Sequence, residues 1–71
     1  MTDLEALKKV ISDSGMTMVA IASKSGIKRE TFYNRLAGIG EFTASEIVGI
    51  TEALHLSKPE RDHIFLGKKL N

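Results

Sequence analysis

The segment Thr17–Leu36, TMVAIASKSGIKRETFYNRL, is the most informative part of this chain. Thr17 is a suitable N-cap for a short helix, because its side-chain oxygen can accept a hydrogen bond from a free amide of the first turn. Gly26 ends that helix, since glycine adopts the left-handed backbone of a tight turn at little cost. A further helix then runs from about 28 to 37. Two short helices joined by a glycine turn predict a helix-turn-helix at residues 17–37.

The apolar residues of this segment indicate how its two helices pack. Ala22 lies four residues before Gly26, and a small side chain there lets the following helix cross closely. Ile27 comes directly after the glycine and is expected to enter the core. Phe32 and Leu36 lie one helical turn apart, so they share a face. We therefore expect these two residues to form the buried side of their helix.

The opposite side of the same helix is polar and aromatic. At ~100° per residue, Glu30, Tyr33 and Asn34 lie away from the buried side, with Arg29 at its edge. Arginine can pair with guanine O6 and N7, asparagine with adenine N6 and N7, and glutamate can accept from cytosine N4. Lys28 and Arg29 at the helix N-terminus favour phosphate. The alternative is an ordinary amphipathic helix with a solvated face.

The charge of the chain is small but unevenly distributed. The whole sequence has a formal net charge of +1, whereas residues 16–40 have +3 and the segments on either side have −1 each. The basic segment holds four cations against a single acid: Lys24, Lys28, Arg29 and Arg35 against Glu30. The positive excess therefore lies where contact with phosphate is expected.

The rest of the chain also shows helical patterns. Three pairs have the spacing of a capping box, in which each side chain binds a free amide at the helix start: Thr2 with Glu5, Thr43 with Glu46, and Ser57 with Glu60. An apolar stripe is expected on the helix after Thr43: Ile47, Val48, Ile50, Thr51 and Leu54. Gly67 is expected to end the last helix. No segment alternates with a period of two, so we predict an all-α fold of five helices in one domain, residues 1–71.

Composition argues against several classes of function. The sequence has no cysteine, and the spacing of His55 and His63 fits no usual ligand pair, so no metal or other cofactor is expected. No serine has a histidine and an acid placed to activate it, so an enzyme is not expected. No apolar run approaches the ~20 residues of a membrane span, and the acidic start is unlike a signal peptide. A soluble, cytoplasmic protein is expected.

Five short elements within residues 16–57 fit one known pattern. They are Ile21-Ala22, Gly26-Ile27, Thr31-Phe32, Gly38 and Ala53-Leu54-His55-Leu56-Ser57. Their combination resembles the Cro/repressor (XRE-type) helix-turn-helix family of bacterial and phage transcriptional regulators. The resemblance implies a compact five-helix bundle of the lambda-repressor-like type. It also implies sequence-specific binding of double-stranded DNA, without a cofactor, by a regulator of phage or prophage style.

The resemblance extends to individual residues. It implies base contacts by Arg29, Glu30 and Asn34, with Tyr33 flanking them, and phosphate contacts where the first helix of the pair begins. Together with the basic segment and the amides of the loop after residue 37, this predicts six contacts to the DNA backbone: Thr17, Met18, Lys24, Lys28, Arg35 and Gly38.

Three of these residues depart from the family pattern. Lys28 replaces the usual Ser or Thr cap, so its helix lacks a side-chain acceptor at the start. Met18 cannot donate a hydrogen bond from its side chain. Arg35 stands where many family members have an apolar residue, and Leu36 is expected to take the inward place instead.

Expected partners follow from the same resemblance. A palindromic DNA operator would be bound by two copies of the chain, and weak self-association through the last helix and tail, with Phe65, Leu66 and Leu70, is one hypothesis. These apolar residues can equally belong to the core. The competing functional hypothesis is a protein-interaction module, such as an antitoxin, an anti-repressor or a regulatory subunit, because a fold does not fix a function.

Overall fold

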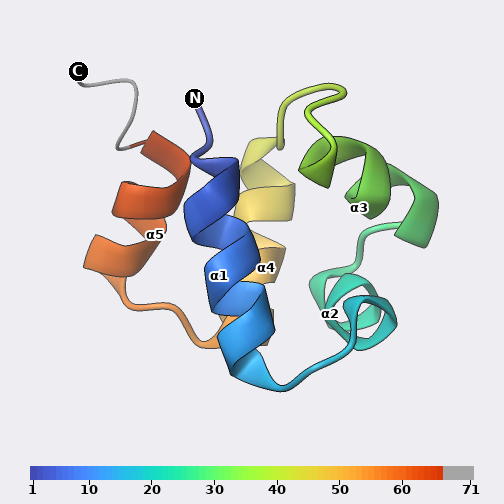
Figure 1. The fold of residues 1–71 in the computed structure, drawn as a ribbon, viewed down its shortest axis with the longest axis horizontal. Helices are drawn as coiled ribbons and strands as arrows, with labels where there is room; N and C mark the ends of the chain where they lie inside the picture. Colours follow the sequence, from blue (N-terminus) through green and yellow to red (C-terminus); the bar gives the residue numbers. More distant parts are fainter. Residues whose placement is uncertain (67–71) are drawn as a thin grey trace.

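The computed structural model describes residues 1–66, which form a compact all-helical domain without strands in that range (Figure 1). Five helices follow one another along the chain: α1 (Leu4–Ser14), α2 (Met18–Ser25), α3 (Arg29–Leu36), α4 (Ala44–Leu54) and α5 (Lys58–Leu66). The predicted all-α class and the number of helices are confirmed. The predictions for Gly67 and Leu70 fall outside the described residues. None of the helices in residues 1–66 is long and apolar enough to pass through a membrane.

The start of α1 differs from the prediction. Asp3, and not Thr2, is the N-cap, and its Oδ1 accepts a hydrogen bond from the Ala6 amide at 3.1 Å. The backbone amide of Asp3 also donates to the Ile64 carbonyl of α5 at 2.6 Å. This long-range bond fixes the chain directly before the helix, so the acceptor at position 3 is used, and the capping box predicted for Thr2 is wrong.

The other helix starts agree with their sequence signals. Thr17 Oγ1 accepts from the Ala20 amide at 3.0 Å, and Thr43 and Glu46 form a reciprocal capping box at the start of α4. Ser57 and Glu60 form the same arrangement at α5, with 2.8 Å between the Ser57 amide and Glu60 Oε1. Each of these caps satisfies amides that the helix itself leaves without a partner.

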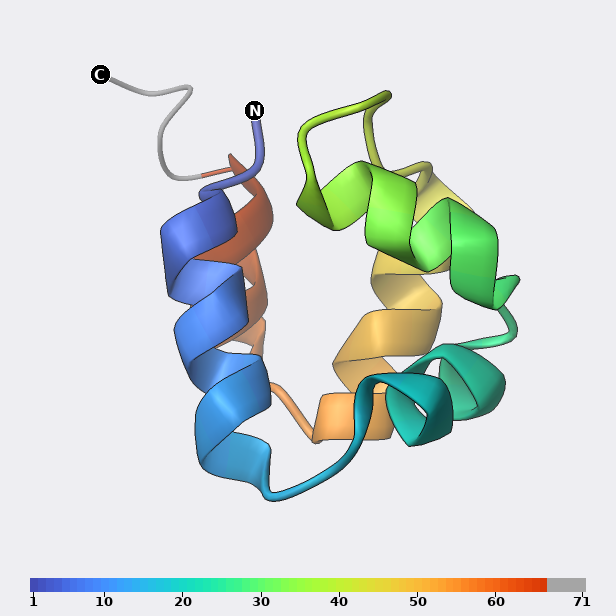
Figure 2. The same ribbon diagram turned by 45° about the vertical axis from the view of Figure 1, so that its right-hand side comes forward.

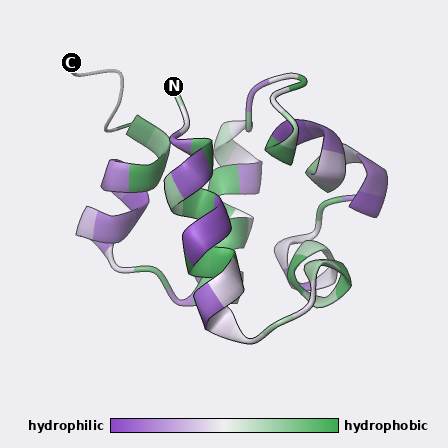
Figure 3. Ribbon diagram, in the orientation of Figure 1, coloured by the Kyte–Doolittle hydropathy of each residue, from purple (hydrophilic) through white to green (hydrophobic). Residues whose placement is uncertain are grey.

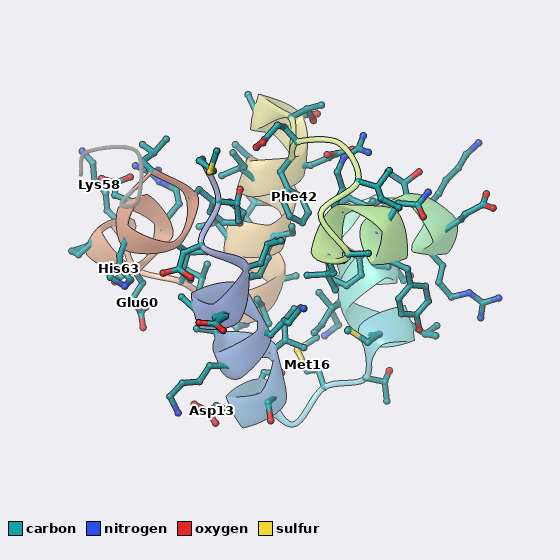
Figure 4. The ribbon with its side chains drawn as sticks, turned by 45° about the horizontal axis from the view of Figure 1, so that its top comes forward. Asp13, Met16, Phe42, Lys58, Glu60 and His63 are labelled. Carbon is teal, nitrogen blue, oxygen red and sulfur yellow. The ribbon has the colours of Figure 1, made fainter. Side chains whose placement is uncertain are left out.

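All five helices contribute to one hydrophobic core. Its largest fully buried side chains are Leu7, Ile21, Phe32, Ile50 and Ile64. The predicted inward placement of Ile27, Phe32 and Leu36 is confirmed, since each is less than a tenth exposed. Phe42, which Figure 4 labels near the middle of the molecule, packs edge-to-face on Phe65 with 5.7 Å between ring centroids. Phe65 therefore belongs to the core.

The predicted apolar stripe of α4 is only partly correct. Val48 is 55 % exposed, whereas Ile50 is completely buried. Two residues along a helix correspond to ~200° of rotation, so Val48 lies on the side opposite to Ile50. The inward face of α4 instead consists of Ile50 and Ala53, with the half-buried Ile47 and Leu54 at its edges.

The helices divide into two groups. Figure 2 shows α1 and α5 side by side on one side of the molecule and α2, α3 and α4 on the other. Within the second group α2 and α4 approach each other very closely at Gly49. A Cβ atom added to Gly49 would lie 2.2 Å from the backbone carbonyl oxygen of Ser25. Since that oxygen cannot move without shifting α2, only glycine fits at this crossing.

Candidate nucleic-acid interface

The turn between α2 and α3 is built as the sequence predicts. Gly26 has φ 74°, in the left-handed region, and the following amide of Ile27 donates to the Ala22 carbonyl at 3.0 Å. Ile27 itself is buried. A three-residue connection that is bonded to α2 and anchored in the core fixes α3 firmly relative to α2.

The predicted outward face of α3 is exposed. Arg29, Glu30, Tyr33 and Asn34 all lie at the surface, and Tyr33 retains 44 % of its accessible area. Figure 3 shows α3 as a mostly hydrophilic helix, in contrast to the neighbouring α2. Within residues 1–66 these four side chains make no hydrogen bond or ion pair. Their polar groups are therefore available to a ligand.

The N-terminus of α3 has no side-chain cap. Lys28 is the N-cap residue with an extended backbone, and it makes no capping hydrogen bond, as expected for a side chain without an acceptor. The first amides of the helix therefore lack an internal side-chain acceptor, and the exposed Lys28 and Arg29 lie beside them. Free amides, the positive end of the helix dipole and two cations together favour an anion at this end.

The residues predicted on α2 differ in their accessibility. Thr17 is exposed, and because its oxygen accepts from Ala20, its hydroxyl hydrogen remains able to donate. Lys24 is exposed in the last turn. Met18 is only half-exposed, and its side chain packs against the core. Met18 can therefore offer a ligand its backbone amide but no polar side-chain group.

Arg35 does not join this exposed face. Its side chain is 23 % exposed, and its Nε lies 3.5 Å from Glu46 Oε1 of α4. Its Nη1 donates to the Ile39 carbonyl at 3.3 Å. The guanidinium is therefore directed at the loop between α3 and α4, which also holds the exposed Gly38. Sequence reasoning gave Glu46 only its capping role, because a pair eleven residues apart has no local signature.

Two shallow hollows lie elsewhere on the described surface. One, of about 240 Å³, is lined by the N-terminus, the start of α1, the end of α3 and the α3–α4 loop, among them Leu4, Arg35 and Phe42. The other, of about 270 Å³, lies between α1 and α5 beside Glu60 and His63, which Figure 4 labels. Both fall below the ~300 Å³ at which pockets for small molecules begin. In residues 1–66 no three potential metal ligands come together.

No family model, curated protein or solved structure matches the chain. The functional assignment therefore depends on the residues and their arrangement. The strongest candidate for a ligand-binding site is the exposed face of α3 together with its uncapped, basic N-terminus. We call these residues the α3 face: Lys28, Arg29, Glu30, Tyr33 and Asn34.

Proposed function

We propose that this chain is a sequence-specific DNA-binding protein, a transcriptional regulator of the Cro/repressor type in which α2 and α3 form the helix-turn-helix. The observation that supports it best is the α3 face. Its side chains have no partner within residues 1–66, while the other side of α3 is fixed in the core by Phe32 and Leu36. A rigid helix with free donors and acceptors is what direct readout in the major groove requires.

The proposed roles follow from the chemistry of each group. Arg29 and Asn34 can each make a bidentate contact with a purine, and Glu30 can accept from a cytosine. The exposed Tyr33 offers an apolar surface and a hydroxyl beside them. Five residues would contact phosphates around this centre: Thr17, Met18, Lys24, Lys28 and Gly38. Thr17 would use its hydroxyl, the two lysines their ammonium groups, and Met18 its amide. The Gly38 amide already donates to the Arg35 carbonyl at 3.1 Å, so at Gly38 only the exposed backbone without a side chain would lie against a phosphate.

The number of copies on DNA is a separate part of the proposal. A single α3 face would cover one half-site, so a palindromic operator bound by two copies is expected. Since Phe65 is only 3 % exposed, self-association through α5 would depend on the exposed Leu66 and not on Phe65. Leu70, the third apolar residue considered for such contact, lies beyond the described residues.

The alternative proposal is a protein-interaction module on the same scaffold. The large exposed apolar side chains favour it, among them Val19 on α2 and Val48 on α4, which are 50 % and 55 % exposed. An apolar protein interface depends little on salt, whereas DNA binding releases counterions from the phosphates.

Selection of bound duplexes from a random pool, followed by a salt titration of the selected site, distinguishes the two. We expect one enriched motif and a log-log plot of affinity against salt with a slope of about −0.9 per phosphate contact. Failure to enrich any motif, with no salt-dependent binding to pooled duplexes, would contradict the proposal.

A further inference from the structure

Arg35 and Glu46 join the end of α3 to the start of α4. The two residues flank the whole connecting loop, residues 37–43, and their side chains are only 23 % and 16 % exposed. The distance between Nε and Oε1 is 3.5 Å. A partly buried pair is screened less than a pair at the surface, so this contact can hold the two helix ends together.

The same carboxylate oxygen also belongs to the capping box of α4. Glu46 Oε1 accepts from the Thr43 amide at 2.9 Å, and the Glu46 amide donates to Thr43 Oγ1 at 3.2 Å. Because Thr43 is the last residue of the loop, Glu46 fixes the loop end by a hydrogen bond, and it contacts Arg35 as an ion pair in which the buried Nε makes no hydrogen bond. The position of Arg35 is thus coupled to the capping box of α4.

The guanidinium of Arg35 also lies against the loop backbone. Nη1 donates to the Ile39 carbonyl at 3.3 Å. A Cβ atom added to Gly40 would lie 2.5 Å from the same Nη1 and 3.2 Å from Cζ. Gly40 therefore lacks a side chain where the guanidinium needs room, and its φ of 80° is also one that glycine tolerates best.

We infer that Arg35 is a positioning residue, which holds the Gly38–Gly40 loop in place beside α3 and does not itself bind phosphate. This inference rests on the proposed function, because the loop amides matter only if DNA passes over them. Gly38 and Gly40 have many accessible conformations in a free chain, and ordering them on binding would reduce affinity. Backbone bonds from Gly38 to the Arg35 carbonyl and from Ile39 to the Asn34 carbonyl hold the start of the loop, and the Arg35 side chain adds contacts at Ile39 and Gly40 that order it before DNA arrives.

Substitutions that change the charge at Arg35 and at Glu46 in opposite senses should then both lower the affinity for DNA. Arg35→Gln removes a positive charge and Glu46→Gln removes a negative one, while glutamine at position 46 can still form the capping box. We expect each variant to weaken DNA binding by about threefold to tenfold, the size expected for a loop that must be ordered on binding. The double variant should bind no worse than Arg35→Gln alone, since Arg35→Gln already removes both the ion pair and the bond to the Ile39 carbonyl.

If Arg35 bound phosphate directly, the results would differ. Glu46→Gln would then release Arg35 and strengthen binding, and Arg35→Gln would reduce the salt slope by about one unit, as expected for Lys28→Gln. Arg35→Lys would keep a phosphate contact, but lysine cannot reproduce the two-sided contacts of a guanidinium, so a positioning role predicts that it resembles Arg35→Gln. Glu52→Gln, an exposed acid on α4, is the matched control for charge.

A measurement without DNA separates this inference from the proposed function. Amide hydrogen exchange and ¹⁵N relaxation of Ile39 and Gly40 in the free protein should show faster motion in Arg35→Gln and Glu46→Gln, and not in Glu52→Gln. Thermal melts would establish that every variant is folded. Unchanged loop dynamics, or a tighter Glu46→Gln complex, would overturn the inference while leaving the proposed function intact. Absence of any salt-dependent DNA binding by the unaltered chain would instead refute the proposed function.

Discussion

Single side chains of the α3 face have two different kinds of role in the proposed complex. Asn34 and Arg29 lie where a base edge could be recognised, whereas Lys28 at the helix N-terminus would meet only phosphate. All three are exposed and unpaired within the part of the chain that the structure describes. Base recognition and phosphate binding can be distinguished experimentally, because only base recognition depends on the DNA sequence.

Asn34→Ala should therefore act on specificity and Lys28→Ala on affinity alone. We expect Asn34→Ala to cost about 1–3 kcal/mol on the preferred site and to relax the choice of base at one position. Lys28→Ala should weaken binding to all duplexes alike and reduce the salt slope by about one. Competition assays with single-base operator variants give both quantities. An unchanged base preference in Asn34→Ala would show that Asn34 does not recognise a base.

His55 is a residue whose backbone conformation is costly. It ends α4 with φ 56° and ψ 44°, the only positive φ outside glycine in residues 1–66. Side chains with a Cβ are strained in this region, and glycine is not. We expect His55→Gly to stabilise the fold by about 0.5–1 kcal/mol. Urea unfolding measures this, with Glu52→Gly as a control that should destabilise, and a loss of stability in His55→Gly would contradict the explanation.

At the scale of elements, the crossing of α2 and α4 determines where α3 can lie. Gly49 allows this crossing, because any Cβ would meet the Ser25 carbonyl. Helix propensity alone predicts that Gly49→Ala stabilises α4 by about 1 kcal/mol. The close approach predicts the opposite, a loss of about 1–3 kcal/mol from overpacking. Thermal melting should show a decrease of about 4–8 °C per kcal/mol for a domain of this size. A higher Tm would show that the helices can separate at little cost.

The start of α5 provides an element-scale test by pH. The Ser57 amide, and to a lesser degree the Ser57 hydroxyl, hydrogen-bond with Glu60 and lower the pKa of its carboxyl below the ordinary value of 4.5. Because the folded pKa is the lower one, this cap stabilises α5 fully above pH 4.5 and is lost as the pH falls through the lowered pKa. A ¹³C titration should place the Glu60 midpoint below 4.5.

Two variants test the cause of that shift. Ser57→Ala should raise the pKa of Glu60 only part of the way, since the larger cause, the backbone amide, remains. Glu60→Gln keeps an acceptor at the same place but cannot titrate. The stability of this variant should therefore lack the loss at acid pH that comes from protonation of Glu60. A Glu60 midpoint at or above 4.5 in the unaltered chain would show that the capping box is not formed in solution.

These elements also show what sequence could and could not predict. The caps at Thr17, Thr43 and Ser57 were predictable because each involves a bond within four residues, and the α3 face because Phe32 and Leu36 fix its rotation. The cap at Asp3 was missed although its bond to the Ala6 amide is equally local, because the backbone bond to Ile64 of α5 that fixes the chain at position 3 has no local signature. The contacts of Arg35 with Glu46 and of Gly49 with Ser25 were missed for the same reason, because residues far apart in sequence meet only in the folded chain.

At the scale of the whole molecule, the unpaired cations are not spread evenly. Lys9, Arg35 and Arg61 form ion pairs with Asp13, Glu46 and Asp62. Of the remaining cationic side chains in residues 1–66, three lie on the α2–α3 segment: Lys24, Lys28 and Arg29. The other two are Lys8 on α1 and Lys58, which Figure 4 shows on the α5 side, away from α3. In a molecule with almost no net charge, the α2–α3 segment thus holds three of the five unpaired cationic side chains of residues 1–66 against one exposed acid, Glu30.

Two double variants with the same change in net charge test whether position or total charge matters. Lys24→Gln with Lys28→Gln, and Lys8→Gln with Lys58→Gln, each take the formal charge from +1 to −1. If DNA lies along α2 and α3, only the first pair should reduce the salt slope, by about 0.9 for each phosphate that is no longer neutralised. The second pair should change affinity slightly and leave the slope as it is, because Lys8 and Lys58 lie on α1 and α5 and not on the two helices proposed to contact DNA. Equal losses of affinity in both double variants would mean that binding follows net charge and that the α3 face is not where DNA is held.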